Sequence, residues 1–172
     1  DPDLAADQFA LVGDLMGAAG YQHYEISNWA KPGRRCQHNL TYWRNGEYLG
    51  LGAGAHGHAA GVRYHIVRQP RVYLRRMAQD EGSYPLSSAV AASQTVTRAD
   101  RLADTAITRL RLLDEGIPLA WFTQTFGETP AAAYGPALHD LLEWGLLAEV
   151  DNSLRLTERG RFLSNQVFHR LI

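Results

Sequence analysis

The stretch from Leu4 to Ser27 reads LAADQFALVGDLMGAAGYQHYEIS, and it carries the clearest fold signal in the chain. Its first part has apolar side chains at helical spacing, and Gly20 follows as a residue that readily ends a helix. Residues 21–27 are rich in side chains that favour strands. A helix, a glycine and a strand in succession form one αβ unit of an α/β sheet. One or two strands do not close such a sheet, so we expect further sequence upstream.

The middle of the chain predicts ordered loop, short strands and one helix. Residues 28–46 combine turn-forming residues with large aromatic side chains, which is typical of a loop that packs on another part of the protein. Residues 82–97 are rich in Ser and Ala and contain Pro85, so they predict a linker. The elements expected between these segments are a short strand over 47–58, a strand over 62–68 and a helix over 70–78.

The C-terminal part has three predicted helices followed by a hairpin. Thr97 is a suitable N-cap for the first helix, and Gly116 and Pro118 mark its end. The other expected elements are helices over 120–126 and 136–144, strands over 147–150 and 154–156, and a last helix after Thr157. This order is the layout of a winged helix. The sequence therefore predicts an α/β fold that ends in a small winged-helix-like α+β domain.

The charges argue against nucleic acid as the ligand of this winged-helix layout. The helix that would enter a DNA groove, residues 136–144, contains Asp140 and Glu143 and neither Arg nor Lys. Phosphate neutralisation dominates nucleic-acid affinity, so we expect no nucleic-acid partner. Nine basic residues lie instead between Lys31 and Arg76, with one acid, Glu47. That segment either attracts carboxylates or phosphates, or is a solvated arginine-rich surface.

Composition excludes several classes of protein. The chain has 172 residues, a net charge of −1 and one cysteine, Cys36. A single cysteine excludes an internal disulfide framework and an all-cysteine metal site. No apolar run reaches the roughly 18 residues of a membrane helix, and the N-terminal residues do not resemble a signal peptide. We therefore expect one or two small domains and a cytoplasmic, reducing location.

The glycine run GLGAGAHG at residues 50–57 contains the spacing G-x-G-x-x-G at Gly52, Gly54 and Gly57. A dinucleotide-binding turn needs a helix directly after this spacing and an acidic residue about 20 residues further on a second strand. A strand-like segment follows here, so we reject a dinucleotide site. The glycines then either leave the backbone open to a ligand or allow neighbouring elements to pack closely.

Candidate ligand-binding side chains lie in HNLTYW at residues 38–43. His38 is suited to ligating a metal or to a structural hydrogen bond, and the second role is commoner for a lone histidine. Tyr42 and Trp43 offer flat faces for a planar ligand. Cys36 lies two residues before His38, but a Cys-x-His pair is too small a ligand set for zinc. Glu25, in a tyrosine-rich strand, either pairs with an arginine or faces a pocket.

A family resemblance is carried by four motifs: YEISNWAKPG at 24–33, HNLTYW at 38–43, EYLGLGAGAHG at 47–57 and LTERGRFLSNQVF at 156–168. They closely resemble the C-terminal part of the oxygen-independent coproporphyrinogen III oxidase-like radical-SAM proteins, most of all the HemW-type heme-chaperone branch. The resemblance covers nearly the whole chain. It implies the end of a radical-SAM (β/α) partial barrel at residues 1–81, a linker at 82–96 and an accessory domain at 97–172.

The resemblance also implies a function. In the chaperone branch an H-N-x-x-Y-W motif is associated with heme binding, and true coproporphyrinogen oxidases lack it. We therefore expect a chaperone that holds heme and transfers it to acceptor proteins. The alternative is an oxygen-independent coproporphyrinogen III oxidase that decarboxylates porphyrinogen propionates.

The implied site residues fall into three groups. The residues that match the heme-binding motif are His38, Asn39, Tyr42 and Trp43. Ala55 and His56 correspond to the family's strand end near S-adenosylmethionine. Side-chain chemistry adds propionate partners at Arg34, Arg35 and Arg44, and it offers two heme-iron ligands, His38 and, as a weaker candidate, Cys36.

The resemblance has one clear departure. The family's [4Fe–4S] cluster is held by C-x-x-x-C-x-x-C, and one cysteine does not hold a cluster that needs three thiolates. We expect the cluster and S-adenosylmethionine in a longer parent protein. A homodimer and a peripheral membrane association through the acceptor proteins are both compatible with the resemblance.

Overall fold

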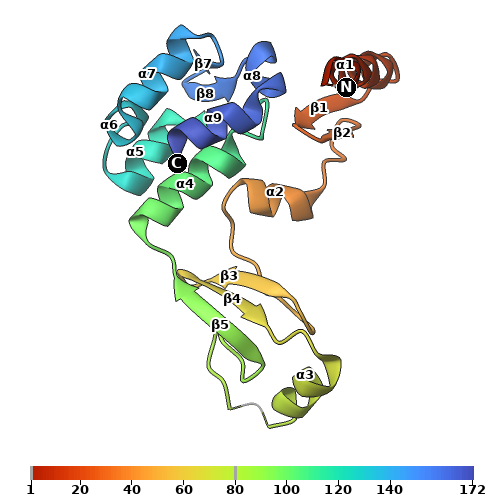
Figure 1. The fold of residues 1–172 in the computed structure, drawn as a ribbon, viewed down its shortest axis with the longest axis vertical. Helices are drawn as coiled ribbons and strands as arrows, with labels where there is room; N and C mark the ends of the chain where they lie inside the picture. Colours follow the sequence, from red (N-terminus) through yellow and green to blue (C-terminus); the bar gives the residue numbers. More distant parts are fainter. Residues whose placement is uncertain (1, 80) are drawn as a thin grey trace. The chain divides into compact units, whose positions relative to one another are not determined.

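A computed structural model describes residues 2–79 and 81–172, and it divides into two compact units (Figure 1). One unit comprises Asp1–Asn45 and Leu102–Ile172, and the other comprises Gly46–Arg101. These limits differ from the boundaries at 81/82 and 96/97 that the sequence suggests. Within the described residues, no helix has the length and apolar character needed to cross a membrane.

The first unit begins with a helix and a hairpin. Helix α1 spans Pro2–Ala18, and Gly20, with a φ of 75°, lies just beyond its end. Strand β1 (Gln22–Glu25) pairs antiparallel with β2 (Asn28–Ala30). The predicted succession of helix, glycine and strand is confirmed. The hairpin also joins the C-terminal part of the same unit, because Glu25 forms a β-bridge with Leu112.

Residues 28–46 are more regular than the sequence predicts. They contain β2 and a second helix, α2 (Gln37–Trp43), so the loop prediction is wrong for these elements. Leu40 of α2 is buried in a small cluster with Tyr24, Ala30 and Leu112. This packing stabilises a helix that is too short to be stable alone.

The C-terminal part of the chain, from Arg98 onward, is mainly helical with a small sheet. Helix α4 (Arg98–Arg109) starts with a capping box, in which the Asp100 amide donates to Thr97 Oγ1 at 3.1 Å and the Thr97 amide donates to the Asp100 carboxylate at 2.8 Å. The elements that follow are β6 (Ile117–Pro118), α5 (Leu119–Phe126), α6 (Pro130–Tyr134), α7 (Pro136–Glu143), β7 (Leu147–Val150), β8 (Ser153–Leu156), α8 (Glu158–Phe162) and α9 (Ser164–Leu171).

The predicted order of helices and hairpin in this domain is confirmed, with three additions. Strand β6 extends the hairpin to a sheet of order β6-β8-β7, α6 precedes α7, and the last helix is divided into α8 and α9. The core contains the fully buried Phe122. Its ring centroid lies 4.6 Å from that of Phe126 and 5.6 Å from that of Tyr134. The Tyr134 hydroxyl donates to the Leu102 carbonyl at 2.9 Å, and burial raises the pKa of this phenol.

The second unit is a three-stranded antiparallel sheet with one helix. Strands β3 (His56–Ala59) and β4 (Val62–Ile66) form a hairpin, and β5 (Val90–Thr95) pairs with β4. Helix α3 spans Pro70–Met77. The strand predicted over 62–68 and the helix predicted over 70–78 are confirmed.

Two predictions for the second unit are wrong. The strand expected over 47–58 is regular only from His56, although Tyr48 forms an isolated bridge with His58. Residues 90–95, placed in a linker at 82–96, form β5 instead. Hydrogen bonding to β4 makes this Ser- and Ala-rich segment a strand, and composition does not reveal such a partner.

Candidate functional site

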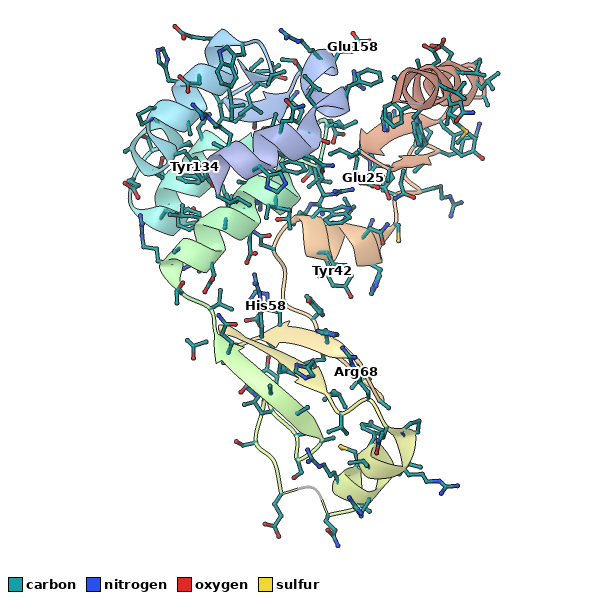
Figure 2. All side chains as sticks on the ribbon, in the orientation of Figure 1. Glu25, Tyr42, His58, Arg68, Tyr134 and Glu158 are labelled. Atoms are coloured by element: carbon teal, nitrogen blue, oxygen red, sulfur yellow. The ribbon has the colours of Figure 1, made fainter. Side chains whose placement is uncertain are left out.

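All four residues of the predicted heme motif lie on helix α2, and Figure 2 labels one of them, Tyr42. His38 and Tyr42 are four residues apart, as are Asn39 and Trp43, so the two pairs form adjacent rows along the helix. The His38 and Tyr42 rings meet edge to face, with 4.8 Å between centroids and 88° between planes. The helix thus places one imidazole and one phenol as neighbours.

The two rows of α2 have different surroundings. His38 is exposed, whereas Trp43 packs against the cluster of Tyr24, Leu40 and Leu112. Trp43 Nε1 is buried and donates to no acceptor in the part of the chain that the structure describes. Trp43 therefore attaches the helix to the protein, while His38 and the half-buried Tyr42 remain accessible.

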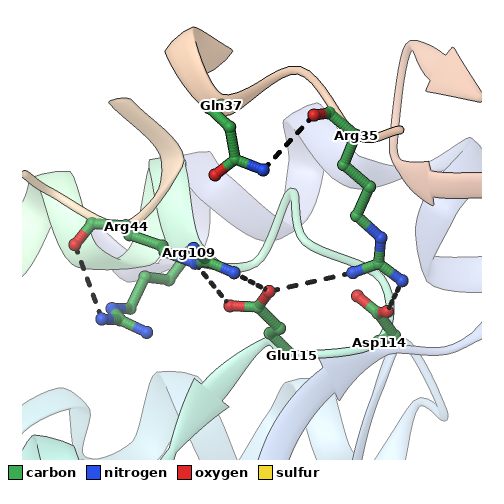
Figure 3. Close-up of polar contacts among 6 residues, drawn as sticks. All are labelled: Arg35, Gln37, Arg44, Arg109, Asp114 and Glu115. Carbon is green, nitrogen blue, oxygen red and sulfur yellow. Dashed lines mark hydrogen bonds and ion pairs between the residues drawn. The ribbon is translucent and has the colours of Figure 1, made fainter. Parts of the chain in front are cut away.

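Two of the three propionate candidates already hold carboxylates (Figure 3). Arg44 binds Glu115 through two parallel bonds, Nε to Oε2 at 2.9 Å and Nη2 to Oε1 at 2.5 Å. Arg35 donates to Asp114 and lies 3.9 Å from Glu115. Arg34 is exposed, and among residues 2–79 and 81–172 its guanidinium makes no ion pair. The sequence offered no signal for these partners, which lie 71 and 79 residues away from the arginines.

The arginine cluster shifts the titration of its acid. Arg44, by hydrogen bonding to Glu115, lowers the pKa of that carboxyl below its usual value of 4.5, and Arg35 and Arg109 add charge that acts in the same direction. Glu115 also raises the pKa of the Arg44 guanidinium. The pair is therefore fully ionised at neutral pH.

A cleft of about 330 Å³ lies next to this cluster. Arg35, Gln37, Leu40 and Arg44 line it, together with residues from the hairpin and the segment before α2. Arg34 and the four motif residues do not line this cleft, so it brings together two of the three candidate arginines without the candidate iron ligand His38.

Cys36 occupies the N-cap of α2 and carries an exposed, free thiol. Its carbonyl accepts the Leu40 amide at 3.0 Å. No group of three or more His, Cys, Asp or Glu side chains suited to a metal ion occurs among the described residues. Cys36 and His38 are thus separate candidate ligands at the start of one helix.

Ala55 and His56 lie in the second unit. His56 is the exposed first residue of β3, with its ring 5.7 Å from that of His65 on β4, and Ala55 packs against the small core of that unit. The glycines of this run fall into two groups, one close-packed and one open. A Cβ on Gly57 would lie 2.1 Å from the Tyr64 ring, and one on Gly50 would lie 2.4 Å from the His56 carbonyl oxygen. A Cβ on Gly52 would meet nothing within 4 Å, one on Gly54 would meet only Arg68 at 4.0 Å, and both glycines have a positive φ. The packing interpretation is therefore supported at Gly50 and Gly57 only.

Residues that sequence reasoning missed hold the C-terminal end of α2. Asn45 Nδ2 donates to Thr105 Oγ1 at 3.0 Å, and its amide oxygen accepts from Thr108 Oγ1. Arg109 Nη2 donates to the Arg44 carbonyl at 3.5 Å. Glu25 is completely buried, with Asn28 donating to it and Arg111 at 3.8 Å, so the arginine-pair interpretation of Glu25 is confirmed.

Comparison with known proteins identifies relatives of this chain. Residues 96–163 match the family model described as "HemN C-terminal domain". The chain is 34% identical over 163 residues to the heme chaperone HemW of Bacillus subtilis, and the alignment covers 95% of this chain and 41% of the relative. It is also 34% identical over 172 residues to the heme chaperone HemW of Escherichia coli, and this alignment covers 97% of this chain and 42% of the relative. The chain is a homologue of HemW proteins. The predicted resemblance is confirmed, and the chain spans about two fifths of the length of these HemW relatives.

A solved structure supports the fold. The chain matches "Coproporphyrinogen III oxidase (HemN) from Escherichia coli is a Radical SAM enzyme", with a TM-score of 0.70 and 17% identity, over 99% of this chain and 41% of that one. The predicted α/β fold class is confirmed by this match. The chain therefore covers about the same fraction of the HemN structure as of the HemW relatives.

Proposed function

We propose that this chain is part of a HemW-type heme chaperone, and that helix α2 holds the heme that is passed to acceptor proteins. The observation that carries the proposal is the exposed His38 imidazole on a helix whose neighbouring row, through Trp43, is anchored in the protein. The HemW relatives carry the name heme chaperone. The oxidase alternative is not favoured, because no comparable observation supports decarboxylation.

The residues of α2 fit the chemistry of heme. Heme is a flat apolar ring with an iron that accepts an imidazole nitrogen and two propionates that accept hydrogen bonds from arginine. His38 would supply the axial nitrogen, and the Tyr42 ring against its edge would restrict rotation of the imidazole. Arg34 would bind a propionate directly, whereas Arg35 and Arg44 would first have to release Asp114 and Glu115. Asn39 lies on the Trp43 row, and Cys36 is the weaker ligand.

The [4Fe–4S] cluster and S-adenosylmethionine of the radical-SAM proteins do not fit this chain as well as heme does. One thiol does not fit a [4Fe–4S] cluster, so the cluster would have to be held by other parts of the parent protein. His56, exposed at the start of β3, and the half-buried Ala55 stay proposed neighbours of S-adenosylmethionine. A homodimer, a cytoplasmic location and membrane association through acceptors also stay proposals.

Hemin titration tests the function. We expect the purified chain to bind hemin with a shifted Soret band, and His38→Ala to weaken binding by about tenfold or more, because it removes the iron ligand. His169→Ala is the matched control, since His169 is likewise exposed on a helix, α9, outside the proposed site. Equal hemin affinities and spectra for the chain and His38→Ala would remove His38 from this role.

A further inference from the structure

We propose that Arg111, supported by Glu25, is the positioning residue that sets the orientation of α2 for heme binding. This inference rests on the proposed function, because it assigns a role in the same site. It adds two residues that lie outside the heme motif at 38–43, one from the β1–β2 hairpin and one from the segment between α4 and β6.

Arg111 is fixed first through its backbone environment. Its carbonyl accepts the Ile26 amide at 3.1 Å, and two residues later the Leu113 amide donates to the Tyr24 carbonyl at 3.1 Å. These bonds flank the bridge between Glu25 and Leu112. The α4–β6 segment is therefore joined to the hairpin like an additional short strand, and the base of the Arg111 side chain has a defined place.

The guanidinium of Arg111 is held from two sides. Nη2 lies 3.8 Å from Glu25 Oε2 and donates to Ser27 Oγ at 3.2 Å. Glu25 is 0% exposed, and Asn28 donates to its other oxygen. Glu25 Oε2 accepts no hydrogen bond among the described residues, so it attracts the Arg111 guanidinium by charge alone. A buried carboxylate requires a cation nearby, and Arg111 supplies it.

The other face of the guanidinium contacts the motif. The Arg111 Cζ lies 4.5 Å from the centroid of the Trp43 ring, a cation–π arrangement. The Trp43 indole nitrogen makes no hydrogen bond in residues 2–79 and 81–172, so the ring is held by apolar packing and by this cation. Trp43 and His38 belong to one short rigid helix. Fixing the indole therefore fixes the rotation of α2, and with it the direction of the imidazole.

The same domain contains a similar group that touches no motif residue. Arg170 of α9 lies with its Cζ 5.4 Å from the Trp144 ring and binds Asp140. This group repeats the arginine, indole and carboxylate of Arg111, Trp43 and Glu25. It therefore provides a matched control for loss of a cation–π contact in general.

The test compares Arg111→Met, Arg111→Lys and Arg170→Met in the purified chain, by hemin affinity, the Soret and EPR signature of bound ferric heme, and the thermal unfolding midpoint. We expect Arg111→Met to weaken hemin binding by about tenfold and to alter the axial-ligand signature. Arg111→Lys, which keeps the cation, should restore most of the affinity. Arg170→Met should leave affinity and signature unchanged, even where it lowers the midpoint.

The outcomes separate this inference from the function it rests on. Loss of hemin binding in His38→Ala, with wild-type affinity and signature in Arg111→Met, overturns the positioning role alone. Failure of the unaltered chain to bind hemin overturns both. Where Arg111→Met does not fold, Glu25→Gln gives the second test: we expect weaker hemin binding, and an unchanged hemin affinity contradicts the role.

Discussion

Arg35 and Arg44 illustrate what single residues can and cannot reveal from sequence. Their side-chain chemistry suits propionates, yet both are paired with Asp114 and Glu115. Those carboxylates stand where a ligand's carboxylates would have to bind. Exposed or half-exposed ion pairs contribute little stability, about 0–1 kcal/mol, so a ligand carboxylate could exchange with them.

Removing the Glu115 carboxylate, which pairs with Arg44, should therefore increase the affinity for a ligand with free carboxylates. We expect Glu115→Gln to raise the affinity for hemin by about two- to fivefold, because the competing ion pair is of that strength. The affinity for the dimethyl ester of hemin, which lacks free propionates, should not change. Spectroscopic titration with both porphyrins measures this, with Asp140→Asn as the control carboxylate. Equal changes for hemin and its ester would exclude Arg44 as a propionate partner.

The ion pair of Glu115 also predicts a pH dependence. Because Arg44 lowers the pKa of this carboxyl below 4.5, the ionised form stabilises the fold, fully so above that value. The contribution is lost as the pH falls below 4.5 through the lowered pKa of the folded state. Denaturation at several pH values should therefore show a difference in unfolding free energy between the chain and Glu115→Gln that is largest at pH 7 and shrinks in acid. A difference constant down to pH 3 would be inconsistent with this.

Among the helices and strands, those with a strong local signal were predictable. Helices α1, α3, α4, α5 and α7 and the β7–β8 hairpin follow periodicity and end signals in the sequence. Helix α2 and strand β5 did not, because their stabilising contacts come from distant residues: Leu40 packs against Leu112, and β5 hydrogen-bonds to β4. The heme motif was therefore found from sequence, and its helical geometry was not.

Helix α8 contains Gly160, which has no room for a larger side chain. A Cβ on Gly160 would lie 1.9 Å from the Leu146 carbonyl oxygen, which is backbone and does not yield easily. We expect Gly160→Ala to lower the unfolding free energy by about 1–3 kcal/mol through this overlap. Gly13→Ala in α1 is the control, because nothing lies within 4 Å of its added Cβ. Chemical denaturation compares them, and equal stabilities would contradict the close approach of α8 to Leu146.

In the whole chain, the segments that are far apart in sequence matter most for the candidate site. Residues 24–45 contain the motif. Residues 105–115, all of them within the HemN C-terminal domain match, supply Thr105, Arg111 and Glu115 around it. Sequence reasoning could propose both segments but not their contact. The apolar side of α1, with Leu11 57% and Leu15 60% exposed, has no covering element among the described residues, and the HemW relatives are more than twice as long.

Hydrogen-exchange mass spectrometry of the chain with and without one equivalent of hemin tests the placement of heme on α2 most directly. Exchange slows where a ligand covers or rigidifies the backbone. We predict slower exchange in the peptides that cover residues 34–45, with a smaller effect around Arg111. Hemin that binds, as judged by its Soret band, while exchange in residues 34–45 stays unchanged would contradict the account.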